Sequence, residues 1–242
     1  MQYIELAQIY DKMIDIDYDS WKRFIEKYMN LNGIDYNGKT VLELACGTGN
    51  MTQRLYDMGL KVVALDVSED MLNFARNKIK NKDVVFINQD MRDLKFDKKF
   101  DFIFCHNDGL NYIIEDEELI DIFNRVNNHL NECGLFLFDI SSEYKLKKII
   151  GNNSFTLNED DYCYIWDNYI DDDILDMYIT FFVKEGKLFK RIDEHHVQRA
   201  HTCDKIVNML KNTGYKKVEI YDDYSFNNIH NETLRITFVA KK

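Results

Sequence analysis

The sequence predicts an α/β fold in which a mostly parallel sheet of roughly seven strands carries helices on both faces. Three observations support this class. Short apolar runs alternate with amphipathic helical patterns between residues 41 and 140. These runs are nearly continuous, as in strands that are buried on both faces. No internal repeat or low-complexity linker interrupts the pattern, and its rhythm changes only after Ser141.

The first element is a helix within the first thirty or so residues. An apolar stripe with the spacing i, i+3, i+4 and i+7 predicts it, and its members are Trp21, Phe24, Ile25 and Tyr28. The Asn37-Gly38 pair then predicts a turn before the first buried strand.

Five strands follow, with helices between them. Their expected ranges are 41–45, 62–65, 84–87, 100–105 and 135–140. Ser68 predicts the start of one helix, because its side chain can cap the backbone and acidic residues follow it in the first turn. Apolar residues between 119 and 130 predict a further amphipathic helix.

After Ser141 the pattern changes to three strand-like runs with little helix between them. They cover residues 162–169, 177–183 and 188–198. This pattern is typical of an antiparallel meander that is too small to be an independent domain. A helix that begins at Thr202 and ends at Gly214, and two strands at 218–221 and 234–240, complete the α/β domain.

The bulk composition excludes several classes of protein. The 242 residues carry a formal net charge of −11, which argues against nucleic acid as a partner. No apolar stretch approaches the ~20 residues of a membrane helix, so we expect no membrane partner. The chain has no proline, and its five cysteines are scattered, which predicts neither a disulfide framework nor a metal site. We expect a cytoplasmic protein without a bound metal.

A glycine-rich turn follows the first strand, within residues 41–50. Such a turn lets the backbone approach a ligand closely at the carboxyl end of the strand, which predicts a nucleotide-type cofactor. A dinucleotide fingerprint would need a third glycine after Gly47 and Gly49, and Thr52 stands in that place.

Two acidic residues near the turn narrow the choice of cofactor. Glu43 lies inside the first strand, where a carboxylate suits an amine or a cation and disfavours a pyrophosphate. Asp66 ends the second strand, where an acid commonly accepts hydrogen bonds from ribose hydroxyls. These residues count against an NAD-dependent oxidoreductase but leave it open as an alternative.

Three motifs in series resemble those of the class I S-adenosylmethionine-dependent methyltransferases. They are E-x-A-C-G-T-G-N from Glu43, L-D-V-S at 65–68 and Q-D-M-R at 89–92. The chain is most similar to small-molecule enzymes related to the sugar-amine N-methyltransferases and glycine-methyltransferase-like proteins. Those enzymes also carry an N-terminal Tyr-Asp pair, here Tyr10-Asp11, and an antiparallel insertion before the sixth strand. The resemblance covers nearly the whole chain, with Ala45 where many members have glycine.

The resemblance implies a Rossmann-like fold with three parts. Residues 1–38 would form an N-terminal helical lid, and residues 39–141 and 200–242 the Rossmann-like domain. Residues 142–199 would be the antiparallel insertion, which serves as a lid on the acceptor side.

S-adenosyl-L-methionine is the cofactor that the resemblance implies. The residues that it assigns to cofactor binding are Tyr10, Glu43, Ala45, Gly47, Gly49, Asp66, Val67, Asp90, Met91 and Cys105. Gly47 and Gly49 would shape the turn around the methionyl group. Asp66 would accept hydrogen bonds from the ribose and Asp90 from the adenine amino group.

Three residues are candidates for catalysis on the acceptor side. His106 and Tyr112 follow the fourth strand, where this fold places acceptor contacts, and His196 lies on an expected strand of the insertion. A histidine is the natural general base near neutral pH. The sugar-amine enzymes are expected to have a histidine near the position of Tyr112, so the proton acceptor stays open. Loop hydrogen bonding, or a solvated sheet face for His196, is the alternative for these side chains.

The sequence as a whole predicts methyl transfer by in-line displacement to a small-molecule amine or hydroxyl. A non-catalytic S-adenosylmethionine-binding regulatory protein is a second interpretation, beside the oxidoreductase. An RNA or protein acceptor is a third possibility, and for RNA the lack of a basic patch is unfavourable. The acceptor and the oligomeric state stay open.

Overall fold

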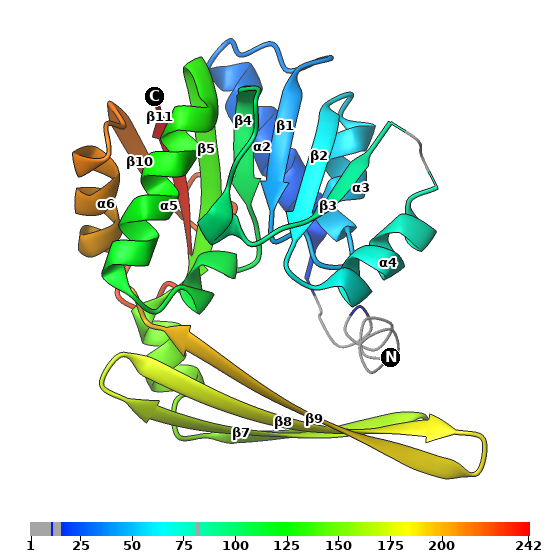
Figure 1. Cartoon of the computed structure of the whole chain (residues 1–242). Coiled ribbons are helices and arrows are strands. Elements are labelled where there is room, and N and C mark those ends of the chain that lie inside the picture. Colours follow the sequence, from blue (N-terminus) through cyan, green and yellow to red (C-terminus); the bar gives the residue numbers. More distant parts are fainter. Residues whose placement is uncertain (1–10, 12–15, 81–82) are drawn as a thin grey trace.

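Two β-sheets organise the computed structural model, which describes residue 11, residues 16–80 and residues 83–242 (Figure 1). The larger sheet has seven strands in the order β10-β11-β5-β4-β1-β2-β3. Its strands are β1 (Thr40–Leu44), β2 (Lys61–Asp66), β3 (Val85–Asn88), β4 (Phe100–Cys105), β5 (Leu130–Ser141), β10 (Lys217–Asp222) and β11 (Arg235–Lys241). Only β11 runs antiparallel to its neighbours in this sheet. The predicted mostly parallel, seven-stranded α/β fold is therefore confirmed.

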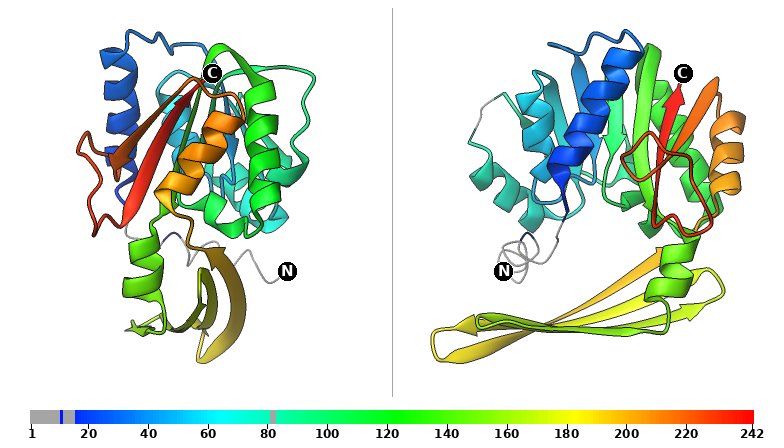
Figure 2. Two further views of the ribbon diagram at one scale, coloured as in Figure 1. Left: turned by 90° about the vertical axis from the view of Figure 1, so that its left-hand side faces the viewer. Right: turned by 180° about the vertical axis from the view of Figure 1, so that it is seen from behind.

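Helices cover both faces of this sheet (Figure 2). The α-helices are α2 (Tyr18–Leu31), α3 (Asn50–Asp57), α4 (Glu69–Lys78), α5 (Asp116–His129) and α6 (Cys203–Asn212). Two short 3₁₀ helices, η1 (Met91–Asp93) and η2 (Gly109–Tyr112), follow β3 and β4. Buried side chains of α5 and α6 pack on one face, and those of α2, α3 and α4 pack on the other.

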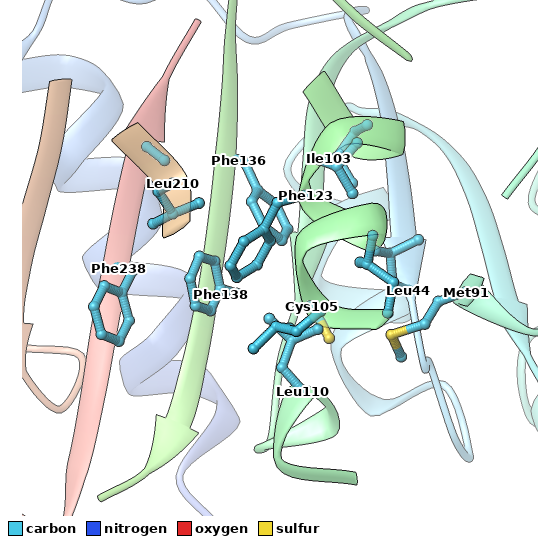
Figure 3. Packing of buried hydrophobic residues seen from close by; sticks show 14 of the residues in the cluster. Leu44, Met91, Ile103, Cys105, Leu110, Phe123, Phe136, Phe138, Leu210 and Phe238 are labelled. Atoms are coloured by element: carbon cyan, nitrogen blue, oxygen red, sulfur yellow. The ribbon is translucent and has the colours of Figure 1, made fainter. Parts of the chain in front are cut away.

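Strand alternation divides the core into these two layers. On β4, Ile103 and Cys105 belong to the cluster under α5 and α6, whereas Phe102 and Phe104 belong to the opposite cluster. Phe138 stacks between Phe136 and Phe238, with ring centroids 4.6 and 4.9 Å apart (Figure 3). Each fully buried aromatic side chain of this kind stabilises the fold by roughly 2–3 kcal/mol, so the central strands form a firm base for the loops at their ends.

The predicted start of α4 is confirmed in atomic detail. The Ser68 hydroxyl accepts a hydrogen bond from the backbone N–H of Met71 at 3.3 Å. The predicted apolar stripe on α2 is also buried in the core. Most strand boundaries agree within one or two residues, but β5 begins at Leu130, five residues earlier than expected, with an irregularity in its pairing with β4.

The smaller sheet has four strands in the order β6-β7-β8-β9. They are β6 (Ser154–Asn158), β7 (Tyr162–Asp171), β8 (Ile174–Glu185) and β9 (Leu188–Arg199), all antiparallel. The expectation of three strands was wrong because β6 was missed. Its alternating Ser-Phe-Thr-Leu-Asn pattern is short, and its residues are exposed or only half-buried.

The smaller sheet lies across the carboxyl ends of the parallel strands (Figure 1). A π-helix, η3 (Lys145–Ile150), connects it to β5 (Figure 2). The Asn111 side chain of η2 donates to the backbone oxygen of Arg199 at 2.8 Å, and the Gln198 side chain donates to Asp108 at 3.2 Å. Strand β9 is thereby attached to the loop that follows β4. The division into an N-terminal lid (residues 1–38), a Rossmann-like domain (residues 39–141 and 200–242) and an insertion (residues 142–199) stays a prediction.

Among the described residues, no helix combines the length and the apolar character needed to cross a membrane.

Candidate active site

A cavity of about 380 Å³ opens at the carboxyl ends of β1, β2 and β4, and residues of β9 cover it. It brings together most of the residues that the sequence singled out. Ten of them line it: Glu43, Ala45, Gly47, Asp66, Val67, Asp90, Met91, His106, Tyr112 and His196. Gly49 and Cys105 do not line it, and Tyr10 lies outside the described residues.

The glycine-rich turn forms the floor of this cavity next to β1. Gly47 has φ +53°, and a Cβ built on it would meet no atom within 4 Å. The backbone is therefore open to close approach by a ligand at this point. Ala45 also adopts a positive φ of 51°, in a region that few non-glycine residues occupy.

Gly49 serves the packing of helices in this structure. At φ +79°, a Cβ here would lie 3.0 Å from Ile79 Cδ1 and 3.1 Å from the Ala75 Cβ. The glycine therefore lets the start of α3 approach α4 closely, and this packing stabilises the glycine-rich turn.

Asp66 is fixed in place by the turn itself. Its carboxylate accepts hydrogen bonds from the backbone N–H groups of Gly47 and Ser68, each at 2.8 Å. Burial raises the pKa of Asp66, and these backbone hydrogen bonds act in the opposite direction. Each carboxylate oxygen has a further lone pair, so Asp66 can still accept hydrogen bonds from hydroxyl groups in the cavity.

Glu43 and His106 form the deep end of the cavity. Glu43 accepts a hydrogen bond from the Thr52 hydroxyl at 2.5 Å, and its other oxygen lies 3.8 Å from His106 Nδ1. The imidazole of His106 is 4% exposed, and within the described part of the chain neither ring nitrogen makes a hydrogen bond. The rings of Trp21 and Tyr224 stack with it, with centroids 6.2 and 6.0 Å away.

Cys105 lies one layer below the cavity. It is fully buried, and burial raises the pKa of its thiol well above the usual value. Gly109 does line the cavity and lies between Cys105 and the open space. A Cβ built on Gly109 would lie 3.0 Å from the Cys105 Sγ and 3.1 Å from the Ala45 Cβ. Sequence reasoning missed Gly109, because only the packing of η2 on the glycine-rich turn shows why no side chain fits there.

The end of the cavity near β3 is charged on one side and apolar on the other. Asp90 accepts hydrogen bonds from the backbone N–H of Arg92 at 2.8 Å and from its guanidinium. The hydrogen bond from the Arg92 side chain lowers the pKa of Asp90. Met91 and Val67 add apolar surface, and Val67 is 69% exposed at the mouth. A contact between Asp90 and adenine stays a prediction.

The wall opposite the glycine-rich turn comes from η2 and β9. His196 Nε2 lies 2.7 Å from a carboxylate oxygen of Glu194, and the Tyr112 hydroxyl lies 3.3 Å from His196 Nδ1. All three residues line the cavity. Sequence reasoning missed Glu194, although the alternation of a strand places residues 194, 196 and 198 on one face.

A buried charged network supports this wall from behind. Asp139 accepts hydrogen bonds from the backbone N–H groups of Asn107 and Asp108, each at 2.8 Å, and from the Tyr224 hydroxyl at 2.5 Å. Arg235 contacts both Asp139 and Asp108. Burial alone would raise the pKa of Asp108, but the charges of Arg235 and Lys145 outweigh it and lower that pKa. The network holds the segment between β4 and η2.

Within the described ranges, no group of three or more histidine, cysteine or acidic side chains could hold a metal ion.

Comparison with known proteins identifies the family. A model described as a methyltransferase domain matches residues 41–134. "Putative methyltransferase YqeM" of Bacillus subtilis (strain 168) is 32% identical over 247 residues, which is 100% of this chain and 98% of that protein. The crystal structure of an S-adenosylmethionine-dependent methyltransferase from Clostridium acetobutylicum ATCC 824 is 40% identical, with a TM-score of 0.91, and covers 99% of this chain and 98% of its own.

A more distant structure, the sugar N-methyltransferase KedS8 from Streptoalloteichus sp ATCC 53650, shares the fold at 14% identity, with a TM-score of 0.79 over 97% of this chain and 92% of that one. The open backbone at Gly47 and the fixed Asp66 carboxylate fit S-adenosylmethionine, which is the cofactor of this family. These matches do not favour the oxidoreductase or the non-catalytic alternative. The chain therefore belongs to the S-adenosylmethionine-dependent methyltransferases.

Proposed function

We propose that this methyltransferase acts on a small molecule and methylates an amine nitrogen or a hydroxyl oxygen. The observation that carries the proposal is the cavity of about 380 Å³, which has cofactor-type residues on one wall and polar, proton-accepting side chains on the other. Sites for small ligands range from roughly 300 to 1,000 Å³, so this cavity is near the lower end. Because the cofactor shares it, the space left suits a compact acceptor group.

The wall next to the glycine-rich turn would hold the cofactor. Asp66 would accept hydrogen bonds from the ribose hydroxyls, while the open backbone at Gly47, with Ala45 beside it, would receive the methionyl part. Val67 and Met91 would enclose the adenine. When bound, S-adenosylmethionine supplies a methyl group that is already activated by the positive charge of its sulfonium.

The chain then has three tasks: to orient the acceptor, to exclude water and to take up a proton. Tyr112, His106 and His196 are the side chains that we propose for the acceptor side. Strand β9 covers the cavity with Glu194 and His196, which supports the proposal that the insertion is an acceptor-side lid. No residue of this set requires a metal to act.

The test is the release of S-adenosylhomocysteine from a fixed panel of acceptors. The panel contains glucosamine, tyramine, catechol and glycine as small amines and hydroxyls, with total RNA and casein as large acceptors. We expect release above the protein-only background with at least one small amine or hydroxyl, and the methylated product in its mass spectrum. Release with RNA or casein alone, or with no member of the panel, would contradict the proposal.

A further inference from the structure

We propose that Glu194, His196 and Tyr112 form a proton relay that removes the proton of the methyl acceptor. Tyr112 and His196 move the proton, and Glu194 is a positioning residue that acts through His196. The inference deepens the proposed function and rests on it.

The three side chains form a continuous chain of contacts on one wall of the cavity. Glu194 and His196 are two residues apart on β9, so both side chains lie on the same face of the strand. Their contact is 2.7 Å, and the step from His196 to the Tyr112 hydroxyl is 3.3 Å. Tyr112 comes from η2, which packs on the glycine-rich turn through Gly109. The relay therefore connects the insertion to the cofactor side of the cavity.

The direction of the hydrogen bonds follows from the chemistry of the groups. An ionised carboxylate only accepts, so Glu194 accepts from the N–H of His196 Nε2. In the neutral ring, Nδ1 then carries a lone pair and accepts from the Tyr112 hydroxyl. Desolvation in the cavity raises the pKa of Tyr112, although 46% of the residue is exposed, and the charge of Asp108 acts in the same direction. The phenol is therefore protonated near neutral pH and able to donate to His196.

The transfer balances without any further reactant. The bond from the acceptor atom to the methyl carbon forms as the carbon–sulfur bond breaks, and that electron pair stays on sulfur. The acceptor proton moves to the Tyr112 oxygen while the Tyr112 proton moves to His196 Nδ1. The imidazolium that results is paired with Glu194, and the 30% exposure of the His196 side chain lets it return the proton to water.

Charged groups from several elements surround the relay. Glu194 contributes a negative charge from β9 itself. Asp108, beside η2, and Asp66, at the end of β2, both act on Tyr112 from the other elements of the cavity. Arg92 lines the same cavity, where its guanidinium is hydrogen-bonded to Asp90 and contacts Glu118. Asp108 is paired with Arg235, so Glu194 is the carboxylate in direct contact with His196.

The neighbouring residue provides a matched control. His195 points to the opposite face of β9, where its Nε2 lies 2.7 Å from Asp176 and its ring stacks on Tyr178 at 4.5 Å. It repeats the histidine–carboxylate contact at the same distance, but neither His195 nor Asp176 lines the cavity. The pair therefore serves as a control for a histidine–carboxylate contact outside the cavity, at a more exposed place (47% and 38% exposed, against 30% and 11% for His196 and Glu194).

His106 is the rival proton acceptor, and its surroundings fit another role. Its ring lies among Trp21, Phe104 and Tyr224, and its Nδ1 is 3.8 Å from Glu43, beyond hydrogen-bond distance. It is 4% exposed, so a proton placed there would have to leave through the cavity itself. The surroundings of His106 suit a side chain that contacts the acceptor better than one that takes up its proton.

The first experiment needs no acceptor. The histidine ring signals of ¹⁵N-labelled protein are titrated by NMR with either S-adenosylhomocysteine or S-adenosylmethionine bound, and H195Q and H196Q assign them by the signal that is lost. The sulfonium charge should make the ring signals of His196 differ between the two complexes and leave those of His195 unchanged. E194Q should shift the His196 signals with either ligand, whereas D176N should affect only those of His195. Equal responses of His195 and His196, or no response of His196, would overturn the relay.

The second experiment uses whichever panel acceptor the wild-type enzyme methylates. H196Q should reduce turnover about 100-fold, and E194Q should reduce it about 10-fold and move the acid limb of the pH–rate profile to lower pH. Affinity for S-adenosylhomocysteine should stay within about 3-fold, and H195Q and D176N should match the wild type. A loss confined to H106Q would overturn the proposal. If no acceptor is methylated, the proposed function fails, and the NMR titration still decides on the relay.

Discussion

The two walls of the cavity are built in different ways. Next to the glycine-rich turn, the groups are backbone atoms and a short acidic side chain, and Asp66 is fixed by Gly47 and Ser68 from the same pair of strand ends. Across the cavity, the groups are long side chains that contact one another, and Tyr112 and His196 are 84 residues apart in the chain. The geometry of the first wall is thus determined by neighbouring strand ends, whereas the geometry of the second depends on how β9 packs on η2.

This difference suits the two tasks of a methyltransferase. The cofactor is the same in every reaction of the family, so a rigid site made of backbone groups is sufficient. The acceptor varies, and side chains on an inserted sheet can change without disturbing the central strands. The comparison predicts that substitutions on the two walls have separable effects.

The largest effect is expected for the charged network that supports the wall on the acceptor side. R235M would leave Asp139 and Asp108 without their buried partner, so we expect a loss of about 3–5 kcal/mol in the free energy of unfolding. Urea denaturation measures it. R191M removes an ion pair whose side chains are 62% and 58% exposed, and this control should leave the free energy of unfolding nearly unchanged. Equal losses in the two variants would show that Arg235 does not support this wall.

A smaller effect is expected at the glycine-rich turn. G47A and G38A both place a Cβ in open space at positive φ, +53° and +70°, so each should lose about 1 kcal/mol of stability. Only Gly47 lines the cavity, so only G47A should also weaken the binding of S-adenosylhomocysteine, by about 10-fold. Calorimetric titration distinguishes the two variants. Unchanged affinity in G47A would mean that the ligand does not approach this backbone.

The smallest effect concerns the pH dependence of stability, to which Asp108 and Asp66 contribute with opposite signs. The pKa of Asp108 is lowered in the fold, so its contribution to stability is complete above the usual pKa of about 4 and is lost as the pH falls through the lowered value. Burial raises the pKa of Asp66, so its ionisation costs stability near neutral pH, and this cost is relieved as the carboxyl becomes protonated on acidification.

Urea unfolding of the wild type and D108N between pH 3 and pH 7 measures the first of these contributions. The difference between the two proteins should be largest near neutral pH and should shrink below about pH 4. A difference that grows on acidification would reverse the assignment.

Local patterns were sufficient to predict the sheet, the start of α4 at Ser68 and the position of Asp66 at the end of the second strand. Each depends on residues that are close in sequence or on the rule that parallel strands end at one edge. Glu194 and Gly109 were missed for a physical reason. Their place in the cavity depends on contacts of β9 and η2 with distant parts of the chain, and no short segment encodes these contacts. Strand β6 was missed although its alternation was present, because five residues, three of them exposed, give a weak signal.

The separation of the two walls is tested most directly by calorimetric titration of S-adenosylhomocysteine into D66A and H196Q side by side. Asp66 offers a charged acceptor to hydroxyls and organises the turn at Gly47, so D66A should weaken binding by about 100-fold. His196 lies on the acceptor side, so H196Q should stay within about 3-fold of the wild type. Comparable losses in both variants, or full affinity in D66A, would contradict the division of the cavity into a cofactor wall and an acceptor wall.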